Sequence, residues 1–232
     1  MVTIFSFPRS GNHFVRYLVE FLTGRATLGA SGFKRAPGQD TPICLRQGPQ
    51  HLKHVSLDKP VATKAHFTSH LGKTDKLVFI LRNPLEAVLS YRYDGFSDIN
   101  SKNPIPPGLI KKLESDSSKF IANLEFYDQF EGPKEIVLYE DLIGGGHEEI
   151  LKSLSNIFDF EESRMTELLS NFDKYRIDSM KSPIRKPISV KKSGHSRFYS
   201  EKVRQTNPDN FDVYVGIIEE LLNHKMIKEY YD

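Results

Sequence analysis

The order of apolar and polar positions along the chain predicts strands and helices in alternation. Residues 2–7 form a short apolar run that ends at Pro8, and over residues 12–23 apolar side chains recur at helical spacing until Gly24. Glycine and proline interrupt residues 24–54 so often that no long element is expected there. The chain therefore begins with a strand, a turn and a helix, followed by a loop-like segment.

Two more strands are predicted at 61–67 and 76–82, and the second is a nearly continuous apolar run, as in a strand covered on both faces. Asn83 and Pro84 then supply an N-cap and a proline at the first helical position, so a helix is expected from Leu85 to about Tyr93. Further expectations are helices at 109–130, 147–158, 161–172 and 209–223, a strand at 135–139, and a basic loop at 181–207.

Interleaved strands and helices predict a three-layer α/β fold, with a central parallel sheet of four or five strands and helices on both faces. A length of 232 residues suits one domain that spans residues 1–232. In such sheets ligands bind at the carboxyl ends of the strands. Candidate chemistry is therefore expected in the segments that follow the strands.

Composition excludes several classes of protein. With 38% apolar and 27% charged residues the chain is neither disordered nor fibrous. The single cysteine, Cys44, supports no disulfide framework and no cysteine-rich zinc site, and is expected to be a small buried or half-buried hydrophobe. No apolar run approaches the ~20 residues of a membrane span, and residues 1–8 do not resemble a signal peptide. The expectation is a cytoplasmic protein with no membrane partner.

Charge is segregated along the chain. Residues 1–92 hold 13 Lys and Arg against 5 Asp and Glu, residues 114–173 hold 4 against 15, and residues 181–204 hold 8 against 1. If the fold joins the two basic stretches, they form a positive cleft for a polyanionic ligand. The alternative is two separate solvated surfaces.

The first predicted turn, residues 7–14, has the sequence FPRSGNHF. Backbone N–H groups at the start of a helix bind phosphate or a similar oxyanion, and Arg9 adds a fixed positive charge. The pattern GxxxxGK[ST] is absent, and with it the lysine and the hydroxyl that a magnesium-dependent phosphotransferase needs. An ordinary connection between a strand and a helix is the alternative interpretation of this turn.

Residues 6–14 resemble the 5′-phosphosulfate loop of the sulfotransferases that use 3′-phosphoadenosine 5′-phosphosulfate (PAPS), where the usual form is YPKSGTTW. A second element of that family is a strand that ends in Arg-Asn, with a serine eight residues after the arginine; here Arg82, Asn83 and Ser90 have this spacing. The resemblance implies that the loop residues hold the 5′-phosphosulfate and that Arg82 and Ser90 hold the 3′-phosphate. The loop residues concerned are Arg9, Ser10, Gly11, Asn12 and His13.

Three further segments are similar to the family in the same order. Lys64-Ala65-His66 stands where cytosolic members carry KTH, whose histidine is the general base. Residues 138–142 are similar to the FYED segment and residues 171–174 to the SFEKM segment. The resemblance implies that Tyr139 packs near adenine and that Phe172 lies on the nucleotide; core aromatic residues are the alternative for both.

The sequence also departs from the family pattern. Arg9 replaces the loop lysine, Asn12 and His13 replace two threonines, and Phe14 replaces tryptophan. Arginine keeps the charge but is a poorer proton donor than lysine. The RKG element near the C-terminus has no clean counterpart. Its nearest placement is Lys191, Lys192 and Gly194, and the rival positions are Arg185, Lys186 and Arg197.

These residues predict a PAPS-dependent sulfotransferase that transfers a sulfuryl group to a hydroxyl or amine without a metal ion. Lys64 and His66 are two residues apart on a predicted strand, so both face the same side. His66 titrates near neutrality and can accept the proton of the acceptor, and His13 is a weaker rival for this role. Lys64 and Arg9 supply positive charge at the reacting group.

Other readings of the sequence stay open. The alternatives are a phosphotransferase of the P-loop type and a nucleic-acid-binding module, for which no recognised motif is present. Nucleic acid is therefore not an expected partner. The acceptor is a small molecule or a carbohydrate that the sequence does not identify, and the oligomeric state is open. A salt bridge for Arg82, a helix-face hydroxyl for Ser90 and a structural histidine for His66 are the non-functional alternatives.

Overall fold

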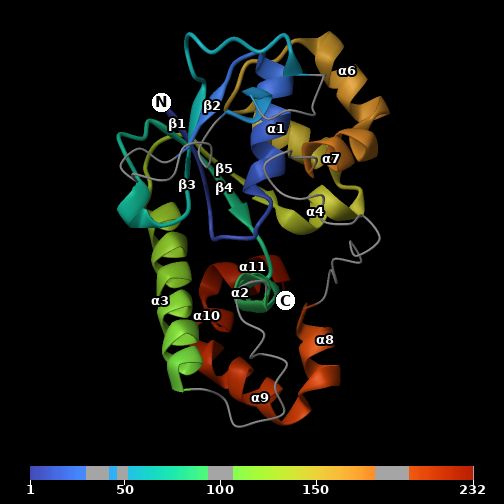
Figure 1. Ribbon diagram of the computed structural model, residues 1–232. Helices are drawn as coiled ribbons and strands as arrows, with labels where there is room; N and C mark the ends of the chain where they lie inside the picture. Colours follow the sequence, from blue (N-terminus) through green and yellow to red (C-terminus); the bar gives the residue numbers. More distant parts are fainter. Residues whose placement is uncertain (30–41, 46–51, 94–106, 181–198, 232) are drawn as a thin grey trace.

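A five-stranded parallel sheet forms the centre of the protein (Figure 1). The computed structural model describes residues 1–29, 42–45, 52–93, 107–180 and 199–231. The strand order is β2-β3-β1-β4-β5, and all pairs are parallel. The strands are β1 (Val2–Ser6), β2 (Thr27–Leu28), β3 (Ala62–Ala65), β4 (Lys76–Leu81) and β5 (Lys134–Leu138). The predicted fold class, with its four or five parallel strands, is confirmed.

The apolar strands at the centre are buried on both faces. All five residues of β1 are buried, and β4 is buried from Leu77 to Leu81. Alternate residues serve two separate cores: Ile4, Val78 and Ile80 belong to one, while Phe5 and Phe79 belong to the other. A strand of this kind needs apolar residues at every position, which is why the sequence of β4 is a continuous run.

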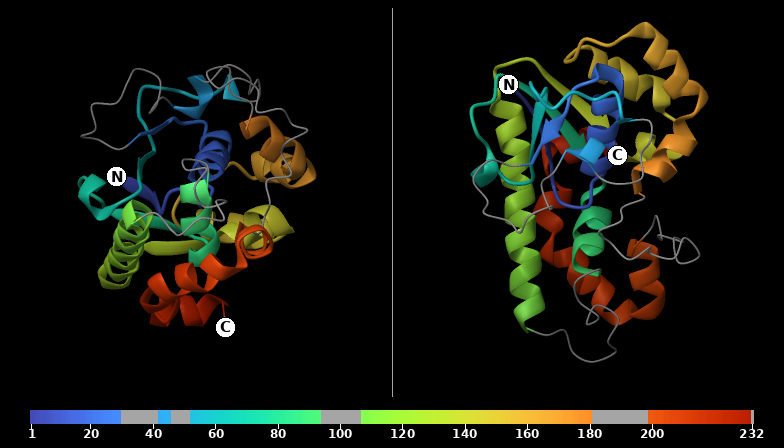
Figure 2. Two further views of the ribbon diagram at one scale, coloured as in Figure 1. Left: turned by 60° about the horizontal axis from the view of Figure 1, so that its bottom comes forward. Right: turned by 45° about the horizontal axis from the view of Figure 1, so that its top comes forward.

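Helices cover both faces of the sheet (Figures 1 and 2). The first core takes residues from α1 (Asn12–Thr23), α4 (Tyr139–Gly144), α5 (His147–Ser155), α6 (Glu162–Ser170) and α7 (Phe172–Met180). The second takes residues from α2 (Pro84–Tyr93), α3 (Pro107–Gln129), α8 (Tyr199–Thr206), α9 (Pro208–Ile217), α10 (Glu219–Leu222) and α11 (Lys225–Tyr231). Two short 3₁₀ turns, η1 (Ile43–Leu45) and η3 (Thr68–His70), complete the described elements.

Several predicted elements differ from the structure. The strand expected at 61–67 is shorter, because β3 ends at Ala65. The tail expected to be a loop as far as residue 207 forms α8 from Tyr199, and the last predicted helix is divided into α9 and α10. The helices α4, α7 and α11 were not expected. In the case of α8 the cause is a tertiary contact: the buried carboxylate of Glu86 accepts hydrogen bonds from the first N–H groups of this helix.

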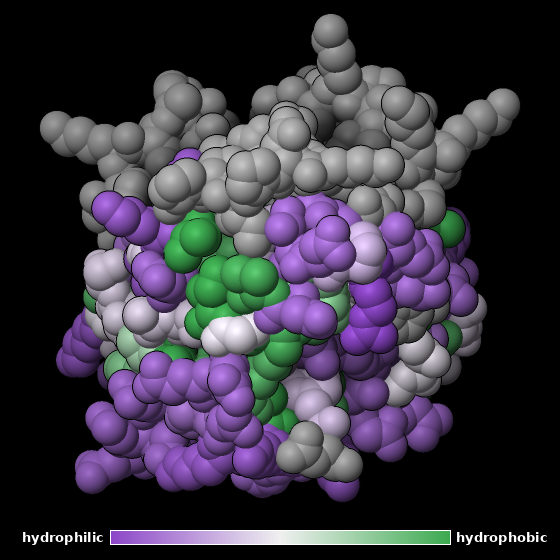
Figure 3. All heavy atoms as spheres, turned by 90° about the horizontal axis from the view of Figure 1, so that it is seen from below, coloured by the Kyte–Doolittle hydropathy of each residue, from purple (hydrophilic) through white to green (hydrophobic). Residues whose placement is uncertain are grey.

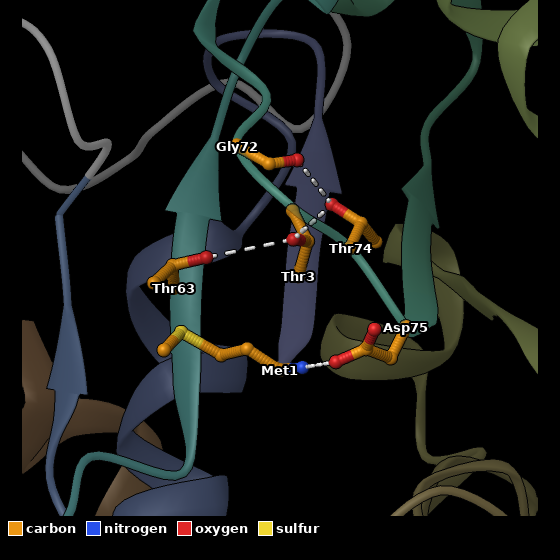
Figure 4. A network of polar contacts seen from close by, with 6 residues as sticks. All are labelled: Met1, Thr3, Thr63, Gly72, Thr74 and Asp75. Carbon is orange, nitrogen blue, oxygen red and sulfur yellow. Dashed lines mark hydrogen bonds and ion pairs between the residues drawn. The ribbon is translucent and has the colours of Figure 1, made fainter.

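A polar network joins the strands at the amino end of the sheet (Figure 4). The hydroxyl of Thr3 in β1 lies 2.8 Å from that of Thr74 and 3.4 Å from that of Thr63 in β3. The N-terminal ammonium group of Met1 pairs with Asp75. These contacts lie at the end of the sheet opposite the turn after β1, where they fasten the starts of neighbouring strands.

Within the described part of the chain, no helix combines the length and the apolar character that a membrane span requires. Seen from below, the surface is largely hydrophilic, and apolar side chains gather in the middle of this face (Figure 3).

Candidate functional site

The turn between β1 and α1 has a backbone that few residues adopt. Arg9 has φ 69° and Gly11 has φ 83°, both in the left-handed region. A Cβ atom on Gly11 would lie 2.9 Å from Leu142 Cδ1 and 3.0 Å from Tyr139 Cδ2, so glycine is required for space as well as for φ. A non-glycine residue held at positive φ is strained, and strain of this kind is typical of functional sites.

The start of α1 points into this turn. Gly11 is the N-cap residue, and its carbonyl oxygen accepts hydrogen bonds from the N–H groups of Phe14 and Val15. The N–H groups of the first helical turn have no partner inside a helix, and they carry its positive dipole end. Arg9 adds charge beside them, so the turn has the composition of an anion-binding site.

Two side chains of the turn are buried and incompletely paired. Asn12 donates from Nδ2 to the Ile4 carbonyl and to Ser6 Oγ, both at 3.2 Å, which ties the turn to the end of β1. Within the described residues, Ser10 Oγ and Asn12 Oδ1 are buried and have no hydrogen-bond partner. Buried polar atoms are rarely left in this state, so a ligand at the turn is a physical explanation for them.

Arg82 joins the turn from the neighbouring strand. It directly follows β4, is 3% exposed, and donates from Nη1 to the Arg9 carbonyl at 2.6 Å. Its guanidinium lies over the ring of Tyr139, 4.3 Å from the centroid. Among the described residues its Nε is buried without a partner. The structure therefore brings Arg9, Arg82 and Tyr139 together from three strand ends.

Ser90 lies on the helix that follows Arg82. Asn83 Oδ1 accepts the N–H of Glu86 at 3.2 Å, which confirms the predicted N-cap of α2. Ser90 is 2% exposed and stands one turn after Glu86. The carboxylate of Glu86 is itself engaged by the N–H groups of Tyr199 and Ser200, at 2.5 and 3.2 Å. The start of α8 is thus bound to Glu86, the residue one helical turn before Ser90 on α2.

His66 lies just beyond the end of β3. Its Nδ1 is 3.0 Å from the Ser6 carbonyl oxygen and 3.3 Å from Ser6 Oγ. A carbonyl oxygen only accepts hydrogen bonds, so Nδ1 carries the proton and, in the neutral ring, Nε2 carries the lone pair. Lys64 pairs in register with Ile4 and stands on the same face of the sheet, the face that α1 covers. His66 therefore lies next to the turn between β1 and α1, and Lys64 lies two residues before it on β3.

The remaining predicted residues have other surroundings. His13 Nε2 lies 2.6 Å from the Ser179 carbonyl oxygen and donates to it, which ties α1 to the end of α7. Phe172 is 2% exposed and lies in the first core. Its ring contacts that of Phe14 and stacks on that of His147, with the two ring centroids 3.6 Å apart. The basic candidates of the tail lie outside the described residues: Arg185, Lys186, Lys191, Lys192, Gly194 and Arg197.

Some residues near the site were not found from the sequence. Glu140 Oε1 accepts the N–H of Asn83 at 3.1 Å, and its Oε2 accepts the hydroxyl of Tyr231 at 2.8 Å. Burial and the Glu140 carboxylate raise the pKa of Tyr231 above its usual value. This pair ties α11 to the residue that follows Arg82. In the described ranges, no group of three or more His, Cys, Asp or Glu has a geometry that could hold a metal ion.

Comparison with known proteins gives low similarities. No family model matches the chain, and no curated protein matches it. Among solved structures, mouse sulfotransferase SULT7A1 complexed with PAP has 13% identity and a TM-score of 0.49, over 96% of this chain and 88% of that one. Retinol dehydratase in a complex with retinol and PAP has 14% identity and a TM-score of 0.48, over 96% and 81%. Similarity at this level establishes no activity, so the function has to follow from the residues of the site.

Proposed function

We propose that this protein is a sulfotransferase that moves a sulfuryl group from PAPS to a hydroxyl or amine of a small molecule or carbohydrate. The observation that carries the proposal is the contact of Arg82 with the anion-binding turn. Arg82 donates to the Arg9 carbonyl while its own Nε, and the nearby Ser10 Oγ, are buried without partners in the described structure. One buried guanidinium, a second arginine in the turn itself, and buried donors without partners at the same end of the sheet suit a ligand with more than one phosphate.

The residues present fit a nucleotide of this kind. Arg9, Ser10 and the N–H groups at Gly11, Asn12 and His13 would hold the 5′-phosphosulfate. Arg82 and Ser90, which are both almost fully buried, would hold the 3′-phosphate. Tyr139 would pack near the base, since its ring already lies under the Arg82 guanidinium. Phe172 is a core residue here and is left out of this assignment.

The chemistry falls to side chains at three strand ends. PAPS, when bound, supplies the sulfuryl group, and the 5′-phosphate of adenosine 3′,5′-bisphosphate (PAP) leaves. His66 accepts the proton of the acceptor at Nε2, because Nδ1 is already committed to the Ser6 carbonyl. The same carbonyl then stabilises the protonated ring. Arg9 and Lys64 supply positive charge where negative charge develops, which is the main requirement of such transfers.

His66 suits the role of base better than His13. In His13 the Nε2 nitrogen donates to a backbone carbonyl at the end of α7, so this ring serves to connect two helices. In His66 the hydrogen bond at Nδ1 leaves the basic lone pair on Nε2. The two rings therefore have opposite tautomers in their neutral forms, and a residue of β1 holds that of His66.

A phosphotransferase is the second candidate, and thermal unfolding in the presence of nucleotides separates the two. At 100 times its dissociation constant a ligand stabilises a protein by about 2.7 kcal/mol. For a chain of this size that corresponds to a rise in Tm of about 5–10 °C. We expect this rise with PAP in the presence of a chelator, and less with ADP. A larger rise with ATP and magnesium than with PAP would favour the phosphotransferase, and no rise with either would remove both.

A further inference from the structure

The buried face of α3 contains polar residues as well as the apolar residues that pack in the second core. Leu113, Phe120 and Leu124 form an apolar stripe at helical spacing, and all are at most 1% exposed. On the same buried face lie Asp116, Ser117 and Asn123. A buried polar side chain costs stability unless it is paired, so each of these positions calls for a partner.

Asp116 has an evident structural partner. Both of its carboxylate oxygens accept hydrogen bonds from Arg92 near the end of α2. Burial raises the pKa of Asp116, and the Arg92 guanidinium opposes that rise. This pair braces α3 against α2, and the ring of Phe120 stacks on Phe7 with centroids 4.9 Å apart. Helix α3 is therefore a rigid element beside the strand ends.

Asn123 has a partner in the candidate site. Its Nδ2 donates to the carbonyl oxygen of His66 at 2.9 Å, across 57 residues of sequence. The side chain is completely buried, and within the described residues its Oδ1 has no hydrogen-bond partner. The buried amide of Asn123 contributes little to stability, because the burial of its unpaired oxygen costs desolvation free energy that no hydrogen bond offsets. The role of Asn123 is therefore indicated by its hydrogen bond to His66.

Asn123 contacts the residue that directly follows β3. The ladder between β1 and β3 ends at the pair Phe5 and Ala65, so residue 66 is the first residue past the last pair of this ladder. Its contacts include those of the ring with the Ser6 carbonyl and Ser6 Oγ, and that of its backbone carbonyl with Asn123. Loss of the contact with Asn123 would allow the backbone of residue 66 to turn and the ring to move off the Ser6 carbonyl.

We propose that Asn123 is a positioning residue for His66. It fixes the backbone of residue 66 so that Nδ1 stays on the Ser6 carbonyl and the basic lone pair stays on Nε2. This inference rests on the proposed function, in which His66 is the base. It adds a residue from α3 to a site otherwise built from strand ends, α1 and α2.

The test is the tautomer of His66 in the variant Asn123→Leu, measured by long-range ¹H–¹⁵N NMR of the histidine rings. Leucine has a similar size and no hydrogen-bonding groups, so the variant is expected to fold. The His66 signals are assigned from the spectrum of His66→Gln. In the unsubstituted protein we expect protonation at Nδ1. In Asn123→Leu the ratio of Nδ1–H to Nε2–H forms should fall about fivefold, which corresponds to the loss of about one net hydrogen bond.

Two further measurements separate this inference from the proposed function and from misfolding. Ser117→Ala, on the same buried face of α3, serves as the control and should leave the His66 signals unchanged. PAP affinity should stay within about threefold in Asn123→Leu, since Asn123 is not assigned to the nucleotide. If Asn123→Leu fails to fold, Asn123→Ala, which removes the amide without adding bulk, takes its place. An unchanged His66 tautomer in the folded variant overturns the inference, whereas failure of PAP to bind the unsubstituted protein overturns only the proposed function.

Discussion

Replacement of Arg82 by alanine is expected to weaken PAP binding strongly. Arg82 is 3% exposed, donates to the Arg9 carbonyl at 2.6 Å and stacks on Tyr139, so its charge is held in one place and largely shielded from water. Truncation of one member of a desolvated charge pair costs ~2–5 kcal/mol. That range corresponds to a loss of affinity of about 30-fold to 5,000-fold.

Calorimetric titration with PAP measures this loss directly. Arg82→Lys keeps the positive charge, but an ammonium group cannot bond to both the Arg9 carbonyl and a phosphate through one planar group. Its affinity for PAP should therefore lie between that of the unsubstituted protein and that of Arg82→Ala. The control is Lys73→Ala, an exposed residue near the polar network at the opposite end of the sheet, which should leave the affinity unchanged. A loss of less than about tenfold in folded Arg82→Ala, or ~1.4 kcal/mol, would remove Arg82 from the nucleotide site.

Three other predictions follow from the same structure. Gly11→Ala should lower the free energy of unfolding in urea by about 1–3 kcal/mol, because alanine is strained at φ 83° and meets Leu142; an unchanged midpoint would mean that the turn has another backbone. His66→Ala should lower the rate of single-turnover transfer of labelled sulfate by a factor of ~10²–10⁴ and change the affinity for PAPS by no more than a few-fold, whereas Arg9→Ala should lower both the rate and the affinity. If His66→Ala keeps most of the rate and His13→Ala loses it, His13 is the base. Burial raises the pKa of several tyrosines above the usual 10, among them Tyr17, Tyr127, Tyr175 and Tyr231, so these side chains ionise first in the unfolded state and the free energy of unfolding should fall as pH rises above that value. Tyrosinate absorbance that reaches the full amplitude of all ten tyrosines near pH 10, without loss of the helical circular dichroism, would contradict this.

The parts of the fold that local patterns specify could be predicted from the sequence. Helix α1 lies where its apolar spacing placed it, and the N-cap at Asn83 opens α2 as expected. The parallel sheet followed from the alternation of elements, and it brought Arg9, His66 and Arg82 to one edge. Cys44 is half-buried, as expected for a lone cysteine.

The parts that depend on distant partners could not be predicted. Glu20 is completely buried in α1 because its carboxylate accepts the N–H groups of Thr27, Ile43 and Cys44, which lie in the segment where the sequence indicated only a loop. Helix α8 starts where it does because of Glu86, 113 residues earlier in the chain. No periodicity reports such contacts, since each is fixed only when the layers pack.

The candidate site shows the same division. Its charged residues were visible because they follow strands. Glu140 and Asn123, in contrast, act through hydrogen bonds to backbone groups of other segments, and Ser6 acts through its own backbone carbonyl, which accepts from the His66 ring. For Asn123 the available signal was a polar residue on the apolar face of a long helix. That signal indicates a buried contact but does not name its partner.

The most direct measurement is a crystal structure of this protein with PAP. The proposed function predicts the 5′-phosphate at the turn of Arg9 to His13, with an oxygen near Ser10 Oγ, and the 3′-phosphate against Arg82 and Ser90. It also predicts His66 Nε2 directed to the side of the 5′-phosphate where the acceptor would enter. A nucleotide bound away from the β1–α1 turn, or crystals grown at saturating PAP that contain none, would contradict the proposed function.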